Sequence, residues 1–532
     1  MSVKIAVSGA AKEAVDRIVP QLVSDLVASR ITGLDATLWG TDAEEEAAKR
    51  LGFTQSVSAS TPLVPDILAL RDKLRAAGVD HFVLCGMGGS SLAPEVITRT
   101  EGVELTVLDA TDPGQVAAAL ADRLATTAVI ISSKSGGTTE TDSQKRVYEK
   151  AFRDAGIDPI DRLVVVTDPG SPLDVSARAD GYRVFNADPT VGGRYSALTA
   201  FGLVPSGLAG VDIQQLLDEA DAMSYSLAID DDSNPGLVLG AAIAGARPLK
   251  DKLGIVSDGT HIVGFGDWIE QLVAESTGKI GKGILPVVLP ADAPELEAGL
   301  ADLQILRLVR DYKATEHLNE GDIEITGTLG ALMLTWEYAV VVAGRLLGIN
   351  PFDQPDVESA KTATRGLLDA RPEPVAAAFT DGGIEVRGTA DVVTGSSDLA
   401  AAVTSVLSAL GDDGYVSVQA YLDRTRFPQL AETRNALAAR AGRPVTFGWG
   451  PRFLHSTGQF HKGGPAVGVF IQITELSPVD LDIPERPFTF GQLIQAQAAG
   501  DASVLAEHGR PVLTITLTDA EAQLPALIAA LS

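Results

Sequence analysis

A run of hydroxyl, lysine and glycine residues follows a short apolar stretch in the first third of the chain. Residues 129–131 (VII) are typical of a buried parallel strand, and they lead into Ser132-Ser133-Lys134-Ser135-Gly136-Gly137-Thr138-Thr139. The glycines allow close backbone approach, and the hydroxyls and N–H groups at a helix start can bind a dianion. Lys134 adds a positive charge. The pattern indicates a phosphate cradle, and an ordinary strand-to-helix turn is the alternative.

A second glycine-rich loop follows the apolar run at 82–85. It reads Gly86-Met87-Gly88-Gly89-Ser90-Ser91, which again combines glycines with hydroxyls. The third glycine of a dinucleotide fingerprint is missing, because Ser91 stands there, and no Walker-type Gly-Lys-Ser/Thr follows. A phosphate ester smaller than a nucleotide is therefore expected. The alternative is a tight turn whose small residues serve helix packing.

Glu275 is the candidate general base. Gln271 and Glu275 are four residues apart, so they share a helix face, and the apolar residues between them predict partial burial. A partly desolvated carboxylate holds a proton more readily, which suits a base that works near neutral pH. The alternative is a solvated glutamate near the helix end at Gly278.

Three more polar residues could act on an anionic sugar. Arg194 follows two glycines, and its guanidinium could stabilise an oxyanion or a planar enediolate. An ion pair on an acidic protein is the alternative for this arginine. Gln354 and Lys361 are seven residues apart, about two helical turns, so they would project from one side of a helix. Because a lysine is usually solvated, this spacing alone indicates little.

Two of the six histidines, His455 and His461, fall in a glycine-rich segment, 455–464, that also holds Lys462. They carry no nearby acidic ligand pattern, which argues against zinc. A catalytic or substrate-binding loop is the better interpretation. His81 precedes a buried strand and is expected to be structural.

Alternating strands and helices must position these loops. Apolar runs predict strands at 82–85, 104–108, 129–131, 162–167 and 182–186, with helices between them. Helices at 213–228, 234–246, 267–276 and 329–347 follow, with strands at 284–289 and, more weakly, at 253–256 and 261–263. Pro355 suits the first position of a helix through Lys361. The order predicts an α/β fold of doubly wound parallel sheets, which bind ligands at the carboxyl ends of their strands.

Length and composition set outer limits on the protein. A chain of 532 residues predicts more than one domain, and the formal charge of −28 argues against nucleic acid or an anionic membrane as a partner. The lone Cys85 excludes an intramolecular disulfide. Neither a signal peptide nor an uncharged 18-residue apolar span is visible, so we expect a cytoplasmic protein. An anionic substrate would need a locally basic pocket in this acidic chain.

In order along the chain, these motifs resemble those of the glucose-6-phosphate isomerase family, whose members contain two sugar-isomerase domains. The matching segments are residues 86–90, 133–141, 192–196, 271–279 and 350–361. The C-terminal part resembles the isomerase half of fused transaldolase–isomerase proteins, including residues 454–459. Helical periodicity predicts a helical segment at 1–60, and a shift in composition predicts an α/β extension at 372–532. The resemblance implies sugar-isomerase domains at 61–212 and 213–371.

The resemblance also implies a role for each matched residue. Gly88, Gly89, Ser90, Ser133, Lys134, Ser135, Thr138 and Gln354 would surround the sugar phosphate. Gly193 and Arg194 would line the substrate, and Arg194 would stabilise an enediolate. Gln271 would position Glu275, the base that moves a proton between C2 and C1. Lys361 would assist ring opening, and Glu140 would orient a catalytic histidine, for which His455 is favoured over His317.

The chain departs from the family pattern at three points. Gly136 stands where a bulkier residue is usual, the context of His317 does not match, and 171 residues follow Lys361. The expected activity is interconversion of glucose 6-phosphate and fructose 6-phosphate in glycolysis and gluconeogenesis, without metal or cofactor, in a possible homodimer. A dual phosphoglucose/phosphomannose isomerase and a non-catalytic sugar-phosphate sensor are the alternatives.

Overall fold

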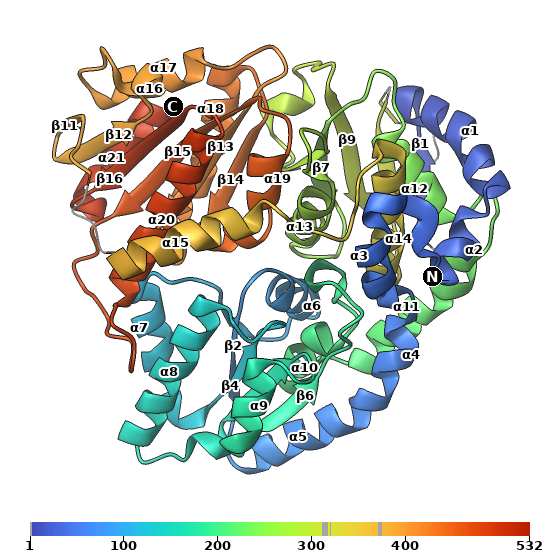
Figure 1. The fold of residues 1–532 in the computed structure, drawn as a ribbon, viewed down its shortest axis with the longest axis horizontal. Helices are drawn as coiled ribbons and strands as arrows, with labels where there is room; N and C mark the ends of the chain where they lie inside the picture. The colour runs from blue at the N-terminus through green and yellow to red at the C-terminus, as the bar shows by residue number, and fades with distance from the viewer. Residues whose placement is uncertain (1–2, 311–317, 320, 371–374) are drawn as a thin grey trace.

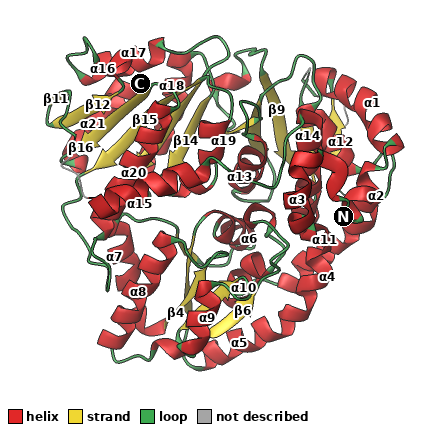
Figure 2. Cartoon of the chain, viewed as in Figure 1, coloured by secondary structure: helices red, strands yellow, loops and turns green. Residues whose placement is uncertain are grey.

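Three β-sheets with helices packed around them make up the chain (Figure 1). The structure is a computed structural model and describes residues 3–310, 318–319, 321–370 and 375–532. We call the sheets first, second and third in the order in which most of their strands occur along the chain. Figure 2 shows helices covering the sheets. The α/β fold class is confirmed.

The first sheet is parallel throughout, in the order β3-β2-β4-β5-β6. Its strands are β2 (His81–Gly86), β3 (Thr106–Leu108), β4 (Thr127–Ser132), β5 (Leu163–Thr167) and β6 (Arg183–Asn186). Every residue of β2 and β4 is buried, as expected for central strands with helices on both faces. The strands predicted here are confirmed to within two residues at each end.

Helices connect and cover these strands. They are α5 (Val64–Ala76), α6 (Leu92–Thr100), α7 (Pro113–Ala121), α8 (Thr139–Asp154), α9 (Pro172–Ala179) and α10 (Ala200–Ala209). Asp112 caps α7 by accepting a hydrogen bond from the Gln115 N–H, and Ser171 caps α9 by accepting one from the Asp174 N–H. His81 is buried between Thr127 and Thr106 at 2.8 Å from each hydroxyl, so its structural role is confirmed.

The second sheet has the order β1-β10-β9-β7-β8. Its strands are β1 (Lys4–Val7), β7 (Lys252–Asp258), β8 (Leu285–Leu289), β9 (Leu303–Val309) and β10 (Ile323–Thr326). Only the β1–β10 pair is antiparallel among these described strands. The prediction of an all-helical N-terminal segment is therefore wrong at β1, and residues 261–263 form no strand.

Helices from the N-terminal segment and from residues 213–347 accompany the second sheet, some packing on its strands and others on neighbouring helices. They are α1 (Gly9–Ser24), α2 (Val27–Thr32), α3 (Thr41–Arg50), α4 (Ser56–Ser60), α11 (Ile213–Ala228), α12 (Pro235–Ala244), α13 (Phe265–Thr277) and α14 (Leu329–Leu347). By length and composition α14 could cross a membrane, but 89% of its apolar window is buried inside the protein. It is therefore a core helix, surrounded by α11, α12 and α13.

The third sheet is mixed, in the order β11-β12-β16-β15-β13-β14. Its strands are β11 (Phe379–Asp381), β12 (Ile384–Gly388), β13 (Tyr415–Tyr421), β14 (Val445–Trp449), β15 (Gly468–Glu475) and β16 (Val512–Leu517). Its helices are α16 (Ala390–Val393), α17 (Leu399–Ser408), α18 (Thr433–Ala441), α19 (Gly458–Gly463), α20 (Phe490–Glu507) and α21 (Ala520–Leu531). The predicted C-terminal α/β fold is confirmed.

Helix α15 (Val357–Ala370) lies between the third sheet with its helices and the helices of the first sheet (Figure 1). Leu368 of α15 shares a core cluster with Phe490 of α20 and with Tyr148 of α8. The helix begins at Val357, so Pro355 lies in the preceding turn and the prediction that it opens the helix is wrong. Gln354 also lies outside the helix, and its spacing from Lys361 is not a helical spacing.

Candidate active site

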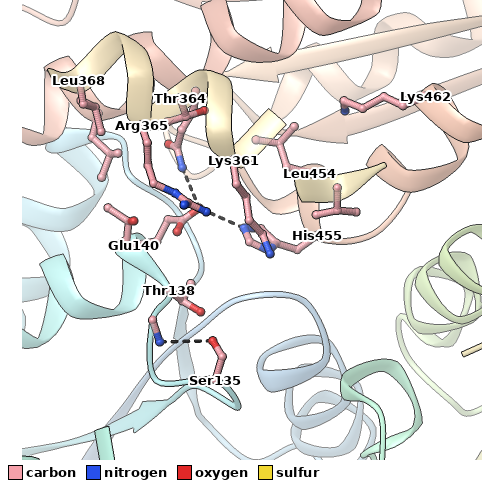
Figure 3. Close-up of a pocket in the computed structure, with 15 residues that line it drawn as sticks. Ser135, Thr138, Glu140, Lys361, Thr364, Arg365, Leu368, Leu454, His455 and Lys462 are labelled. Atoms are coloured by element: carbon pink, nitrogen blue, oxygen red, sulfur yellow. Dashed lines mark hydrogen bonds and ion pairs between the residues drawn. The ribbon is translucent and has the colours of Figure 1, made fainter. Parts of the chain in front are cut away.

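A pocket of about 350 Å³ lies where the loops of the first sheet meet α13, α15 and the C-terminal part of the chain. The predicted site residues in its lining are Gly88, Gly89, Ser90, Ser133, Lys134, Ser135, Thr138, Gly193, Arg194, Gln271, Glu275, Gln354, Lys361 and His455. Glu140 lines an adjoining cavity of about 270 Å³, together with Lys361 and His455 (Figure 3). His317 lies outside the described residues. The structure thus brings distant motifs to one place.

The pocket is locally basic in an acidic protein. Arg50, Lys134, Arg194 and Lys361 stand in the lining against the carboxylates of Asp168 and Glu275. This excess of positive charge opposes the overall formal charge of −28. The lining therefore meets the requirement for an anionic substrate.

The hydroxyl-rich loop connects β4 to the N-terminus of α8. The Ser133 and Thr138 hydroxyl oxygens are 3.1 Å apart, and Thr138 occupies the N-cap position of α8. Helix N–H groups and paired hydroxyls at such a position favour an anion. Lys134 forms an ion pair of 2.7 Å with Asp168, which the sequence analysis did not identify. Burial lowers the pKa of Lys134, and Asp168 opposes that shift.

The position of Gly136 explains why this chain departs from the family pattern. Gly136 has φ +69°, and a Cβ added there would lie 2.7 Å from both the Cβ and the backbone N of Leu173. A side chain would therefore strain the backbone and collide with the start of α9. The neighbouring Gly137 has only the Ser135 hydroxyl near its missing Cβ, at 3.8 Å.

Replacing Gly136 with alanine is expected to raise the KM for fructose 6-phosphate by about 10-fold, because the left-handed backbone costs about 1–2 kcal/mol with a Cβ and the loop must shift. Gly137→Ala is the matched control and should stay within about two-fold of the wild type. Steady-state kinetics of both variants test this. Equal KM values for the two variants would contradict the explanation.

The glycines of the second loop serve close packing. Gly88 has φ +56°, and a Cβ there would lie 2.8 Å from both the Gln271 amide N and the His455 carbonyl O. A Cβ on Gly89 would collide with the Gly193 carbonyl. These glycines therefore allow the loop to pack closely against Gln271, Gly193 and His455, and both also line the pocket. Ser90 also lines the pocket, with an exposed fraction of 8%.

Glu275 lies on α13 between two groups that hold its carboxylate. Gln271 donates a hydrogen bond of 3.3 Å to Oε2, and Arg194 Nη1 is 3.7 Å from Oε1. The Glu275 side chain is 14% exposed, so the expected partial burial is confirmed. One oxygen therefore faces a cation and the other an amide, inside a pocket wide enough for a sugar.

Arg194 is fixed by several acceptors. Its guanidinium donates to Ser276 Oγ at 2.7 Å, to the Pro351 carbonyl at 2.6 Å and to Gln354 Oε1 at 2.8 Å. The side chain is only 2% exposed. A cation held this firmly is preorganised to face a developing negative charge. The ion pair named as the alternative for this arginine is also present, with Glu275 at 3.7 Å, and it lies inside the pocket.

His455 reaches the pocket from the short 3₁₀ helix Arg452–His455, which follows β14. Its Nε2 lies 3.0 Å from Glu140 Oε1. Both side chains are drawn in Figure 3. Gln497 of α20 donates a 2.7 Å hydrogen bond to the same carboxylate oxygen. Gln271 donates to the His455 carbonyl at 2.8 Å, so the base-bearing helix and the histidine are linked directly.

The second histidine of the C-terminal segment has a different place. His461 is buried, with Nδ1 2.9 Å from the Tyr415 hydroxyl and Nε2 3.3 Å from the Ser417 hydroxyl. Burial lowers the pKa of His461 well below its usual value. It is therefore a core residue, and His455 is the member of this pair that faces the pocket.

Several residues near the site gave no recognisable signal in the sequence. Gln497 is 357 positions from Glu140, and Asp168 follows a strand as many loop aspartates do. Lys279 donates hydrogen bonds to the Asn350 and Asp353 carbonyls, both at 2.5 Å, and so fixes the loop that carries Gln354. Its neighbours in sequence, Gly278 and Ile280, mark only a helix end.

Two ionisable groups near the pocket have strongly shifted pKa values. Burial raises the pKa of Glu270 to about 8; Asp267 adds to the rise, and Arg452 opposes it. Burial, with help from Arg194, lowers the pKa of Lys279 to about 7, against the pull of Asp353. Glu270 therefore binds a proton more readily than in the unfolded chain, and Lys279 less readily.

These shifts predict a pH dependence of stability. The pKa of Glu270 is 4.5 in the unfolded chain and about 8 in the folded protein, so between these pH values Glu270 is protonated more often in the folded state. The stability that this proton provides is therefore full at low pH and is lost as the pH rises. Glu270→Gln should flatten the fall in Tm between about pH 5.5 and about pH 7 by removing up to about 1.4 kcal/mol per pH unit. Lys279 affects the stability mainly above this pH range, where its contribution to the free energy of unfolding increases with pH. An unchanged slope of Tm against pH would contradict the assignment.

Comparison with known proteins agrees with this geometry. The family model described as Phosphoglucose isomerase matches residues 74–279. A Natronomonas pharaonis protein named "Probable glucose-6-phosphate isomerase" is 30% identical over 371 residues, which cover 60% of this chain and 86% of that protein. The glucose-6-phosphate isomerase of Acaryochloris marina is 28% identical over 429 residues, covering 66% and 81% of the two chains.

A solved structure also shares the fold. The crystal structure of a glucose-6-phosphate isomerase from Chlamydia trachomatis superposes with a TM-score of 0.52 at 19% identity, covering 68% of this chain and 86% of that one. At this identity the likeness concerns the fold alone. The identity to the Natronomonas pharaonis protein over most of its length carries the assignment: the chain belongs to the glucose-6-phosphate isomerase family.

Proposed function

We propose that this chain interconverts glucose 6-phosphate and fructose 6-phosphate by proton transfer between C2 and C1. The observation that carries the proposal is the Glu275 carboxylate, held by Gln271 and Arg194 in the pocket that also contains the hydroxyl-rich loop and His455. Members of the family act on hexose phosphates, and the reaction belongs to glycolysis and gluconeogenesis. The oxygen-rich loop, the base and the fixed cation are the parts that an aldose–ketose isomerase needs.

The phosphate group binds first and sets the position of the sugar. Ser133, Ser135 and Thr138 hold it at the N-terminus of α8, with Ser90 and Gln354 completing the contacts. Lys134 supplies charge that Asp168 partly offsets. Binding energy from this non-reacting end is used to place C1 and C2 beside Glu275.

The sugar ring then opens. As the C1–O5 bond breaks, O5 gains a proton and the C1 hydroxyl loses one, so a group that both gives and takes protons is required. The imidazole of His455 takes this role, with Glu140 holding the ring in place and Lys361 stabilising charge on oxygen. Burial raises the pKa of the Glu140 carboxyl, but His455 and Lys361 outweigh this effect and hold the pKa below its usual value, so a carboxylate stands beside the imidazole.

Isomerisation follows on the open chain. The Glu275 carboxylate removes the proton from C2, the electrons move to the C1 carbonyl oxygen, and a cis-enediolate forms beside Arg194. The proton on O2 moves to O1, and Glu275 returns its proton to C1 to give the ketose. Gln271 keeps the carboxylate aimed at both carbons.

Formation of glucose 6-phosphate from fructose 6-phosphate, followed in a coupled assay with a glucose-6-phosphate dehydrogenase, tests the function. Turnover by the wild type supports it, and binding without turnover would instead indicate a sugar-phosphate sensor. Mannose 6-phosphate in a parallel assay for fructose 6-phosphate distinguishes a dual phosphoglucose/phosphomannose isomerase. The family assignment favours the single activity.

Three further expectations stay predictions. Among the described residues no group of three or more His, Cys, Asp or Glu could hold a metal ion, and activity measured after chelator treatment tests the expected independence from metal. Light scattering tests the expected homodimer. Cell fractionation tests the expected cytoplasmic location.

A further inference from the structure

A buried cluster of charges joins the third sheet to the first sheet next to His455. Arg452 donates a 2.5 Å hydrogen bond to Glu95 of α6, and its other terminal nitrogen lies 3.1 Å from Asp109, just after β3. Arg424, which follows β13, pairs with the same two carboxylates at 3.2 Å and 3.5 Å. Two arginines from the C-terminal part of the chain thus bridge two acids of the first sheet region, and we call these four residues the arginine clamp.

The clamp differs from a surface ion pair in its burial. The Asp109 side chain is 1% exposed, and those of Arg452 and Glu95 are 13% and 15% exposed. Charges removed from water in this way are costly unless their partners stay in place. The clamp therefore fixes the distance between the first and third sheets more firmly than apolar contact alone.

Arg452 also acts on the helix that carries the base. The carboxylates of Asp109, Glu95 and Asp267 raise the pKa of Arg452 in spite of its burial, and Arg452 in turn opposes the raised pKa of Glu270. Asp267 and Glu270 belong to α13, as do Gln271 and Glu275. The Arg452 guanidinium therefore interacts electrostatically with carboxylates of α13 in addition to its contacts with Glu95 and Asp109.

The place of Arg452 in the chain gives the clamp a consequence for catalysis. Arg452 and His455 are the first and last residues of one short 3₁₀ helix. Ser456, the next residue, donates a 3.4 Å hydrogen bond to Glu270. Arg424 lies on a separate segment, 28 residues before Arg452. A movement of Arg452 would thus move His455, whereas a movement of Arg424 would not do so directly.

We propose that Arg452 is a positioning residue that holds His455 at Glu140 by tying its short helix to Glu95 and Asp109. The proposal rests on the proposed isomerase function. In this proposal, the C-terminal part of the chain holds His455, the ring-opening group, at a fixed position in the pocket. A displacement of about 1 Å at a catalytic group can cost about 100-fold in rate, so the clamp acts on kcat through geometry.

Arg452→Lys tests the proposal, because lysine keeps the buried charge but cannot reach two carboxylates with a planar fork. Arg424→Lys is the matched control, since it weakens the same two contacts away from His455. We expect similar losses of Tm in both variants. We expect kcat to fall by about 10-fold or more in Arg452→Lys alone, with the affinity for an acyclic phosphorylated sugar acid, which needs no ring opening, unchanged.

A double-mutant comparison separates positioning from general damage. If Arg452 acts through His455, Arg452→Lys should have no further effect on kcat in a His455→Asn background. Additive losses, or equal losses of kcat in Arg452→Lys and Arg424→Lys, would overturn the proposal. A wild type without turnover would instead overturn the proposed function, so the two failures are distinguishable.

Discussion

Replacing Glu275 with glutamine is expected to lower kcat by about 10²–10⁴-fold, the range that a positioned general base supplies. Glutamine has nearly the same shape, so it can still accept a hydrogen bond from Gln271, whose amide lies 3.3 Å from the carboxylate. It cannot remove the C2 proton. The loss should therefore fall on kcat, while the affinity for an acyclic phosphorylated sugar acid stays close to that of the wild type.

Glu44→Gln provides the control for this experiment, because Glu44 is exposed on α3. It should leave kcat and KM within about two-fold of the wild type. Near-normal kcat in Glu275→Gln would show that another group is the base. A parallel loss of ligand affinity would show that the variant disturbs the pocket as a whole.

Replacing His455 with asparagine is expected to lower kcat for the cyclic substrate by about 100-fold, within the range of general acid–base catalysis. The reason is the 3.0 Å contact between His455 and Glu140, which places an imidazole able to exchange protons beside the sugar site. Binding of an acyclic phosphorylated sugar acid should change little. The rate of ring opening of fructose 6-phosphate, measured by stopped flow, isolates the step that the substitution should slow.

The matched control is His261→Asn, because His261 is exposed and lies in a loop after β7. Its kinetics should equal those of the wild type. If His455→Asn opens the ring at the normal rate, His455 is not the acid–base group. His317 would then become the candidate.

The sequence was sufficient for the buried parallel strands of the first sheet and for the loops that follow them. β2 and β4 are continuous apolar runs, so both were predicted, and the chemistry-bearing loops at their carboxyl ends do meet at one pocket. Glu275 and Gln271 share a helix face as their spacing predicts. These features depend on local patterns that a single segment carries.

Features that depend on distant segments were not predictable. β1 pairs with β10 across more than 300 residues, from Lys4 to Thr326, and with 4 residues, KIAV, it is too short to be recognised as a strand from its own sequence. β9 contains Gln304 and Arg307 among its apolar residues, which hides it from a search for apolar runs. Whether such segments form strands depends on their pairing with strands that are distant in the sequence.

The same limit applies to the site. Gly136 departs from the family pattern because Leu173 lies next to it, and the local sequence does not indicate that contact. The partner of His455 was implied by the family resemblance, whereas Gln497, which bonds to the same carboxylate, comes from a helix near the C-terminus. Helix α15 starts at Val357, so Pro355 belongs to the preceding turn. The local sequence does not determine at which of these positions the helix starts.

Fructose 6-phosphate incubated with the enzyme in D₂O tests the central claim most directly. If Glu275 moves a proton through an enediolate, some of that proton exchanges with solvent, and NMR should detect deuterium at C2 of the glucose 6-phosphate formed. The Glu275→Gln variant should incorporate none on the same timescale. Product formed by the wild type at full rate without any deuterium at C2 would indicate direct hydride transfer between C1 and C2 and would contradict the account.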